Sequence, residues 1–493
     1  RGFAAGRPGT RAEGLGGGGA PLRVMSMGAT ARLAEFSVKC RWEELPAAAI
    51  DAAKRAILDS VGVMLAGSLE PPALIVQRLA EAEGGAPLCT VLGTRLRTGG
   101  VWAALANGTA GHALDFAATN FALMGHPSVP LLAAALAAGE LVLVNGRALI
   151  HAFLVGFEVE TTLAEAMNPG HYARGWHATS TLGSLGAAAA AAKLLGLDPG
   201  ETRHALAIAA SQASGLKENF GTMTKPFHAG HAARGGVLAA LLAREGFTGS
   251  EIAIEGPQGY LRVLGSQTEE PAAALERLGA PWKILTTGVA VKPYPSCACT
   301  HSIIAGLLEL RQAHAIRPED VAQVTIGVNP LVPGILIHHD PHTGLEGKFS
   351  AEFCAAAALV DGSVGIATFK DERLADPALR GVMGRVKMVV DPTIPSDLEH
   401  HMWTRLKVRL AGGRALEVPP REVPGHPSAP LSREALLAKF TDCAGRVLAR
   451  DRVDSIAQML EGLEGCPDLR SLTATLRPHP MPPTSSPLPT GER

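Results

Sequence analysis

The sequence predicts a mainly α protein, with a large all-helical domain and a smaller α+β domain. Its 493 residues exceed one ordinary domain of ~150 residues. From about Ala31 to Gly279, Ala and Leu recur at spacings of three and four residues, and Gly or Pro separates the runs. From about residue 290, β-branched residues begin to alternate with polar ones. We therefore expect packed helices first and a sheet afterwards.

The first domain is assigned to residues 28–285, after an N-terminal extension. Helical spacing is clearest in six runs, and strand signals between them are nearly absent. These runs should pack on one another as an all-α domain. They are 47–66, 100–114, 129–142, 180–196, 201–213 and 230–245.

The smaller domain is assigned to residues 286–412. Its expected strands are Val321–Val328, Val386–Asp391 and Thr404–Leu410, and helices are expected near 302–314 and 350–361. Helical periodicity returns in Leu431–Leu463. We therefore expect residues 413–470 to pack against the first domain.

Both ends of the chain lack periodic apolar residues. Residues 1–27 are rich in Gly and Arg, with neither the apolar core nor the cleavage-like end of a secretory signal. We interpret them as a disordered extension or as translated upstream sequence, with Met25 or Met27 as the true start; an Arg-rich transit peptide is the alternative. Residues 471–493 are assigned to a Pro-rich tail that is expected to be disordered.

Charge and cysteine content narrow the partner and the compartment. Lys plus Arg number 45 against 46 for Asp plus Glu, so no basic excess attracts nucleic acid or an anionic membrane. Glu140 and Lys193 interrupt the apolar stretches, which indicates buried helices and not membrane spans. Seven cysteines are too few for a disulfide scaffold. We expect a cytoplasmic protein that binds a small molecule.

Two short motifs could suggest a metal site. Cys297-Ala-Cys299 lacks a second Cys or His pair at zinc-finger distance. The adjacent histidines of 338–342 are followed by Pro and look like an exposed loop, without the helical pair of a zinc enzyme. The sequence therefore predicts no metal.

Polar residues gather where loops meet helices. This happens in five segments: 115–119 with 126–128, 175–179, 225–228, 292–301 and 344–350. Ser128, Thr179 or Ser180, and Thr300 or Ser302 are expected to be helix N-caps.

This spacing puts a set of cationic or titratable side chains just before a helix or in its first turn: His126, His177, Lys225, His228 and His301. Helix N-termini favour anions, so a cation there is locally unfavourable unless an anion binds nearby. A single histidine before a helix usually caps or packs, a single lysine there is usually solvated, and Asp115, after the run 100–114, could lie in a surface turn. Their recurrence indicates a carboxylate site.

Several longer strings carry a more specific signal. They are GWHATSTLGSLGAAAAAAKLLGLD, GTMTKPFHAGHAARGG, GFTG followed by EGPQGY, VAVKPYPSCACTH and TGLEGKFSAEFCAAAALVDG. On these strings the chain resembles the MmgE/PrpD family from about Ala31 to Leu463. Members include 2-methylcitrate dehydratase, cis-aconitate decarboxylase and an iminodisuccinate epimerase. The resemblance implies a helical domain, a smaller α+β lid domain, a cleft between them, a homodimer, and neither metal nor organic cofactor.

The resemblance also implies site residues. Asp115 and Thr119 match the Asp and Thr that open the family's cleft motif, and His126 matches the His of its His-Pro step. His177 matches the His of the Gly-aromatic-His motif. Lys225 matches the Lys before the next helix, with His228 as its companion.

The chain departs from the decarboxylase pattern at three places. Cys297 stands where a histidine is expected, Phe353 where a tyrosine is expected, and Ala117-Ala118 where the decarboxylase is acidic. The lost imidazole and phenol could both have carried protons, so the decarboxylase activity itself transfers less directly.

The predicted function is a cofactor-independent lyase, a dehydratase or decarboxylase, acting on a small di- or tricarboxylic acid. Such reactions pass through an enolate-like species that needs nearby positive charge and a placed proton carrier. Lys225 would supply the charge, His126 and His177 the proton transfer, and Asp115 would orient a histidine. Thr119, His228, Lys292 and His301 are the expected substrate-binding residues.

Two alternatives remain open. An epimerase of the same family needs two proton carriers on opposite faces of one carbon, and Cys297 could be one of them. A small buried apolar role suits Cys297 equally well. The other alternative is a non-catalytic paralogue that only binds a carboxylate or a protein partner.

Overall fold

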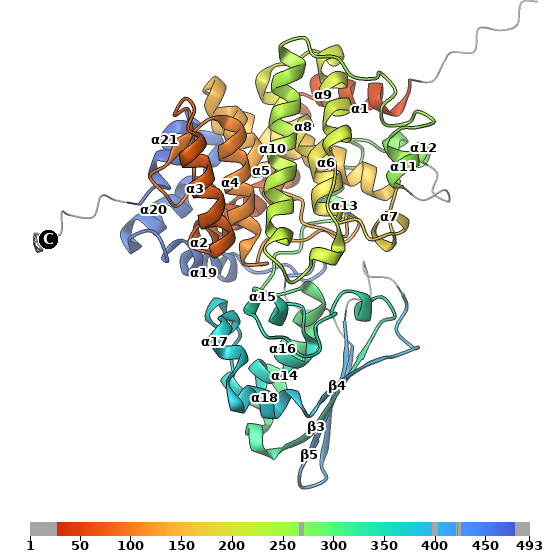
Figure 1. The fold of residues 1–493 in the computed structure, drawn as a ribbon, viewed down its shortest axis with the longest axis vertical. Coiled ribbons are helices and arrows are strands. Elements are labelled where there is room, and N and C mark those ends of the chain that lie inside the picture. Colours follow the sequence, from red (N-terminus) through yellow and green to blue (C-terminus); the bar gives the residue numbers. More distant parts are fainter. Residues whose placement is uncertain (1–26, 266–270, 397–402, 421, 423–424, 479–493) are drawn as a thin grey trace, which may run out of the picture.

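The computed structural model of the protein describes residues 27–265, 271–396, 403–420, 422 and 425–478. Helices from the first 290 residues and from the last part of the chain pack together, and a four-stranded sheet with its own helices lies beyond one end of them (Figure 1). The predicted fold class, mainly α with a smaller α+β part, is confirmed.

The helical part is built around α8, whose alanine run lets neighbouring helices approach closely. Almost every residue of α8 is buried, and it packs against α5, α6, α9 and α10. A short hairpin, β1 (Cys89–Thr90) and β2 (Arg97–Thr98), lies beside α4. The helices are α1 (Ala29–Lys39), α2 (Ala47–Gly67), α3 (Pro71–Glu83), α4 (Gly100–Ala113), α5 (Ser128–Val142), α6 (Gly146–Glu165), α7 (Gly170–Ala173), α8 (Ala178–Leu195), α9 (Pro199–Gln212), α10 (Thr224–Arg244), α11 (Tyr260–Leu264), α12 (Pro271–Glu276), α13 (Lys283–Thr286), α19 (Arg433–Ala444), α20 (Arg450–Glu461) and α21 (Leu469–Thr475).

The crossing of α4 and α10 depends on glycine. A Cβ atom built on Gly108 of α4 would lie only 2.7 Å from Cα of Gly230 on α10. Since any side chain would push the helices apart, two glycines permit the backbone contact. The close crossing brings Lys225, near the start of α10, beside His112 and Asp115 at the end of α4.

The α+β part contains a mixed sheet in the order β4-β3-β5-β6. Its strands are β3 (Val321–Val328), β4 (Val386–Val390), β5 (Arg405–Leu410) and β6 (Ala415–Val418); β4 is parallel to β3, and the other pairs are antiparallel. Alternate side chains such as Val324, Ile326 and Val408 are fully buried, in a core shared with α14 and α16. The helices are α14 (His301–His314), α15 (Gly344–Gly347), α16 (Ala351–Asp361), α17 (Asp371–Leu374) and α18 (Pro377–Met383).

After the sheet the chain returns to the helical part, where α19 packs against α2 (Figure 1). A buried ion pair anchors this return: Nζ of Lys439 lies 2.6 Å from Oδ1 of Asp59. The same two side chains hold the loop after α4, because Lys439 donates to the carbonyl of Phe116 and Asp59 accepts from the amide of Ala118. The C-terminal return therefore fixes the segment that follows Asp115.

Two predicted boundaries need correction. Strand β6 lies beyond residue 412, where the sequence analysis ended the smaller domain, because Ala415–Val418 pairs with β5 as a hairpin. Residues 471–475, assigned to the Pro-rich tail, belong to α21, where Leu472 is buried against the helical part. The predicted extension 1–26 and the tail from residue 479 lie outside the described residues.

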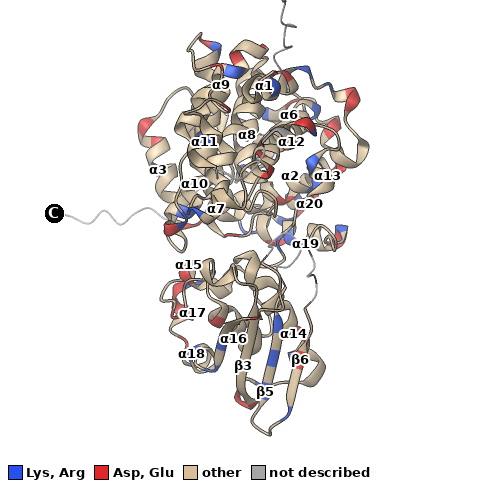
Figure 2. Cartoon of the chain, turned by 90° about the vertical axis from the view of Figure 1, so that its right-hand side faces the viewer, with Lys and Arg blue, Asp and Glu red and all other residues tan. Residues whose placement is uncertain are grey.

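Basic and acidic residues are both found along the two parts of the chain (Figure 2). This matches the near-equal numbers of basic and acidic residues in the sequence. Within the described ranges, none of the helices combines the length and the apolar character that a membrane span requires.

Candidate active site

A cavity lies where the helical part meets the α+β part, and both parts line it. It encloses about 570 Å³ of space free of protein atoms, including its opening. Except for His228 and His301, all of the predicted site residues line it. The lining is Asp115, Thr119, Asn120, Phe121, Met124, Gly125, His126, Tyr172, His177, Phe220, Lys225, Lys292, Cys297, Ala298, Cys299, Ile335 and Phe349.

Asp115 is a buried carboxylate and not a surface turn. It follows the end of α4 in a left-handed backbone conformation with φ of 50°, which Asp adopts more readily than most residues. Its carboxylate accepts hydrogen bonds from Lys225 and Lys292. Burial alone would raise the pKa of Asp115, but these two ammonium groups hold it well below its usual range. The group is therefore an anion at neutral pH.

The two lysines that contact Asp115 differ in what else they bind. Nζ of Lys292 donates to the backbone carbonyl of Asp115 at 2.9 Å, to its Oδ2 at 3.2 Å and to the carbonyl of Ser296 at 2.8 Å. An ammonium has three N–H donors, so Lys292 is fully used by the protein. Lys292 lines the cavity, as expected of a substrate-binding residue, and its contacts also make it a support for Asp115; that it binds substrate stays a prediction.

Lys225 keeps a donor for the cavity. Its Nζ donates to Oδ1 of Asp115 and, at 3.1 Å, to Nε2 of His112. The ammonium also lies over the rings of Phe220 and Phe349, at 5.4 and 5.0 Å from their centroids. Burial lowers the pKa of Lys225, while Asp115 opposes that effect. One N–H of a partly desolvated cation is thus left to meet a bound anion.

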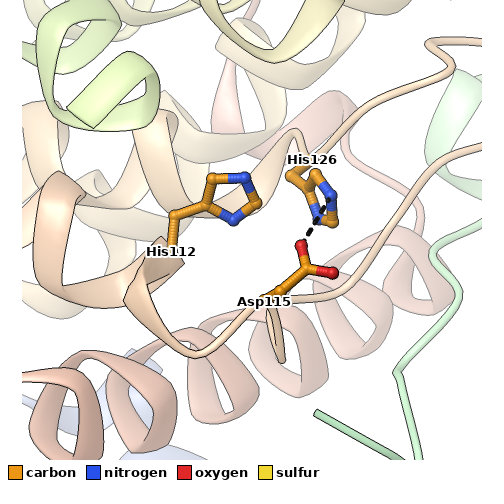
Figure 3. A group of neighbouring side chains, drawn as sticks. All are labelled: His112, Asp115 and His126. Atoms are coloured by element: carbon orange, nitrogen blue, oxygen red, sulfur yellow. Dashed lines mark ion pairs between the residues drawn. The ribbon is translucent and has the colours of Figure 1, made fainter. Parts of the chain in front are cut away.

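His112 was missed by the sequence analysis, because it lies inside the helical run 100–114 and at none of the loop junctions. Its ring is 4.3 Å from that of His126, centroid to centroid, and Figure 3 shows both rings beside Asp115. Burial and the neighbouring Lys225 lower the pKa of His112 well below its ordinary value. Because Nε2 accepts from Lys225, the proton of this neutral ring is on Nδ1.

His126 lies just before α5 with one ring nitrogen directed to the protein. Its Nδ1 is 3.2 Å from the carbonyls of Ala117 and Ala118, so the proton is on Nδ1 and Nε2 carries the lone pair. Nε2 lies 3.8 Å from Oδ1 of Asp115 (Figure 3). Burial and the two lysines lower the pKa of His126 far below 6.5, against the opposing effect of Asp115. The result is a neutral imidazole with a free basic nitrogen at the cavity.

His177 is the residue before α8 and forms a pair with His228 of α10. Their Nδ1 atoms are 2.9 Å apart, so one of these nitrogens donates and the other accepts. The ring of His177 stands edge-on to Phe220 at 5.0 Å, and its Nε2 is left for the cavity. Burial, then Lys225, lowers the pKa of His177 well below its ordinary value. His228, predicted to bind substrate, lies behind His177 and outside the cavity lining.

The thiols of Cys297 and Cys299 lie on the side of the cavity that belongs to the α+β part. The amide of Cys297 donates to the carbonyl of Lys348, which fixes the backbone there. A hydrogen bond with the Cys299 thiol lowers the pKa of Cys297, and Lys292 adds to this against the effects of burial and of Asp115. The same hydrogen bond and burial raise the pKa of Cys299.

Lys348 adds a third buried cation near Asp115. Its ammonium donates to the carbonyl of Leu114, the residue before Asp115. Burial lowers its pKa to about 8. The segment 344–350 was singled out in the sequence, but this lysine was not given a role there. Lys348 does not line the cavity but bonds the backbone beside Asp115, and its position in the sequence gives no sign of that contact.

Tyr172 was also missed, because it lies in the short helix α7 ahead of the motif that contains His177. Its ring lines the cavity, and burial raises the pKa of its phenol far above the usual value, so the hydroxyl keeps its proton. Phe353, where a tyrosine was expected, packs against Phe369 in the core of the α+β part and lies outside the cavity lining. His301 lines a second, adjoining hollow that shares Thr119 and Lys292 with the cavity.

The expected N-cap hydroxyls serve other purposes. Oγ1 of Thr179 accepts from the amide of His126 at 3.0 Å, and Oγ1 of Thr300 donates to the carbonyl of Cys297 at 2.8 Å. The hydroxyl of Ser128 is buried and finds no hydrogen-bond partner among the described residues. The N-cap residues of α5, α8 and α14 are Pro127, His177 and Thr300, and none of them makes a side-chain cap hydrogen bond. Two of the hydroxyls thus position site residues.

The donor atoms of His112, Asp115 and His126 lie within 4.8 Å of one another, a spacing that could hold a metal ion. However, the Lys225 ammonium already contacts both Asp115 and Nε2 of His112. A metal would have to displace this cation in a site that Lys292 also makes positive. The contacts fit an ammonium–carboxylate pair and not a metal centre.

Comparison of the sequence with known proteins shows which family the chain belongs to. The chain is 30% identical to the cis-aconitate decarboxylase of Mus musculus, over 86% of this chain and 88% of the mouse protein. It is 29% identical to the cis-aconitate decarboxylase of Homo sapiens, over 88% and 91% of the two chains. For the cis-aconitate decarboxylase of Aspergillus terreus the identity is 26%, over 91% and 96%.

Two domain matches cover most of the chain on either side of the cavity. Residues 31–272 match the MmgE/PrpD N-terminal domain, and residues 294–464 match the MmgE/PrpD C-terminal domain. The cavity residues fall in both matches, with Asp115 and Lys225 in the first and Cys297 in the second. The chain belongs to the MmgE/PrpD family.

Proposed function

We propose that the protein is a lyase that acts on a small di- or tricarboxylate without a metal or organic cofactor, with cis-aconitate as the first candidate substrate. One observation carries the proposal: His126, His177 and Lys225 line one cavity, and each histidine bonds the protein through Nδ1, which leaves Nε2 for a substrate. Enolate-like intermediates need proton carriers and a cation together. The names of the relatives supply the candidate substrate.

The charge around the cavity supports an anionic substrate. The ammonium groups of Lys225 and Lys292 contact the carboxylate of Asp115, and that of Lys348 bonds the carbonyl of the residue before it. All four side chains are almost completely buried. A cationic excess in a poorly solvated site is unfavourable unless an anion enters it. Because the chain as a whole has a net charge of only −1, this excess is local to the cavity.

In this proposal the residues have separate roles. The neutral His126 is the base, because its lone pair is on the nitrogen that faces the cavity. His177 is the proton donor. It donates from Nε2, because its Nδ1 bonds His228. Lys225 stabilises the negative charge that develops on the substrate carboxylate when a C–COO⁻ bond or a C–H bond breaks. Asp115 orients Lys225 and keeps it charged.

A substrate panel tests the proposal. The purified protein is incubated with cis-aconitate, 2-methylcitrate, citrate and related dicarboxylates, before and after treatment with a chelator, and products are identified by NMR and mass. Loss of CO₂ or water from one of these acids, unchanged by the chelator, is the expected result. Binding without any chemical change across the panel would instead support a carboxylate-binding paralogue.

An epimerase is the second candidate, and the place of Cys297 favours it. This thiol lines the same cavity as His126 and His177, and its pKa is lowered by the hydrogen bond with Cys299. Two carriers on different walls could exchange a proton at one carbon. In D₂O an epimerase gives a product that differs from the substrate only by one deuterium at the inverted carbon, whereas a lyase changes the composition.

The proposal includes a homodimer, which the family resemblance implies. Light scattering of the purified protein should give twice the chain mass of 51.0 kDa. A mass equal to that of one chain at working concentration would refute this part without affecting the proposed chemistry.

A further inference from the structure

The hydrogen bond between His177 and His228 joins a cavity residue to one that lies outside the cavity. Their Nδ1 atoms are 2.9 Å apart, and His177 lines the cavity while His228 does not. Each neutral ring has one protonated nitrogen and one lone pair. The pair is thus a continuous chain of ring nitrogens, with Nε2 of His177 at the cavity end and Nε2 of His228 at the other.

The far end of this chain lies near the surface of the protein. His228 is 5% exposed, and its Nε2 makes no hydrogen bond within the described part of the chain. One helical turn further, His231 lies with Nε2 3.2 Å from Oγ of Ser214, an exposed residue. A proton path from solvent to the ring of His228 would enter from this side of the molecule.

The loop itself holds the pair in place. The amide of His177 donates to the carbonyl of Gly215 at 3.0 Å, and the hydroxyl of Ser180 donates to the carbonyl of His228. A Cβ atom on Gly215 would lie 2.7 Å from Cβ of Ser180 and 3.5 Å from Cγ of His228, and φ of Gly215 is 130°. Only glycine allows the loop to pass this close to Ser180, beside the ring of His228.

We propose that His228 is a relay residue that supplies protons from solvent to His177 while substrate fills the cavity. The inference rests on the proposed lyase function. In the relay, Nε2–H of His177 protonates the substrate carbon, the Nδ1 proton of His228 moves to Nδ1 of His177, and a solvent acid protonates Nε2 of His228. When product leaves, cavity water protonates Nε2 of His177, the Nδ1 proton returns to His228, and His228 releases its Nε2 proton to solvent. One proton is consumed per product.

The electrostatics of the site explain why such a relay is needed. Loss of CO₂ leaves a carbanion that must take up one proton in each turnover, and the catalytic histidine is buried. Burial and Lys225 lower the pKa of His177 and so disfavour its imidazolium form, and His228 and His126 add to this effect. Asp115 alone favours the charged ring among these groups. A neutral imidazole that gave up its proton alone would become an imidazolate. Simultaneous replacement through His228 keeps both rings neutral.

The experiment compares two replacements of His228. His228→Asn places an amide near the position of Nδ1 and keeps a hydrogen bond to His177, but it has no second ring nitrogen; His228→Ala removes both. The relay predicts that His228→Asn lowers kcat on the identified substrate by ~10²-fold with little change in KM. It also predicts that small imidazole buffers restore kcat of this variant in proportion to their concentration. A purely structural role predicts a normal kcat for His228→Asn and a loss only for His228→Ala.

A matched control and a second measurement separate this inference from the proposed function. His204 is half-buried, bonds backbone groups of Gly249 and lies away from the cavity, so His204→Asn should leave kcat unchanged. ¹⁵N-histidine NMR measures the rate at which the Nε2 proton of His177 exchanges with solvent, with or without turnover. Slower exchange in His228→Asn supports the relay; equal rates overturn it even if the wild-type protein proves to be another kind of enzyme.

Discussion

Lys292 holds Asp115 at two points, its backbone carbonyl and its carboxylate, with one ammonium group. We therefore expect Lys292→Met to act on stability first. Loss of one partner from a buried ion pair costs about 3–5 kcal/mol, and the carbonyl of Asp115 also loses its donor. Thermal unfolding should show a clear fall in Tm together with reduced kcat. A variant with unchanged Tm would show that Asp115 is held mainly by Lys225.

Lys225→Met is expected to act on substrate. Its ammonium has a donor left for the cavity, and a charge-assisted hydrogen bond contributes about 1.5–3 kcal/mol, or roughly 10- to 150-fold in kcat/KM. Steady-state kinetics on the identified acid measures this. Lys283→Met is the matched control, because Lys283 is also buried and paired, with Glu165, but lies on α13. If both variants lose the same kcat/KM, the effect of Lys225 is not specific to the site.

His126 should set the acid limb of the pH profile. The pKa of its ring is lowered below 6.5 by burial and by Lys225 and Lys292, so the neutral base persists below pH 6.5. We expect kcat/KM to fall only as the pH drops through this lowered pKa. In His126→Gln the limb should vanish and turnover should fall by ~10²–10⁴. Near-normal turnover with the same limb would assign the base to His177 or Cys297.

Lys348 should set an alkaline limb. Burial lowers its pKa to about 8, so its charge is present at pH 7 and is lost as the pH rises through that value. Since the charge lies near Asp115 and the cavity, KM for an anionic substrate should rise above pH 8, on the order of tenfold. In Lys348→Met, KM should be raised already at pH 7 and stay flat. A wild-type KM that is constant from pH 7 to 9 contradicts this role.

Phe353→Tyr should not increase activity, although a tyrosine was expected at this position. The ring is fully buried beside Phe369, outside the cavity lining, so an added hydroxyl would enter an apolar core. An unsatisfied buried hydroxyl costs about 1–3 kcal/mol. Denaturant unfolding should show that loss, with kcat unchanged. A large gain in kcat would mean that α16 presents this position to the substrate.

Regular spacing in the sequence was sufficient to predict most of the fold. Strand Val321–Val328 was predicted with its observed bounds, and helix α2 to within one residue, because the apolar residues of each recur in the sequence with the period of its element. Strand β6 was missed as part of the sheet because its four residues alternate too briefly to form a signal. Helix α21 was not predicted, because it is short and the Pro-rich segment directly after it led us to assign most of it to the tail.

The site was predicted where a residue type and a loop junction coincided, as for His126 and Lys225. His112 escaped because one histidine inside an alanine-rich helix looks like a packed residue until α10 crosses it. The direction of the histidine pKa shifts was also beyond the sequence. It depends on burial of the rings, and then on Lys225 and other groups from distant segments, which together outweigh Asp115 and which only the folded arrangement brings together.

The pair of Asp59 and Lys439 has a consequence for synthesis of the chain on the ribosome. Lys439 and Phe116, which it holds, are separated by 323 positions. At 5–20 residues per second, roughly 15–65 seconds pass between the translation of the two residues. During this interval the loop after α4 has Asp59 in place but lacks its second anchor. Asp115 is therefore synthesised long before the lysine that anchors the segment after it.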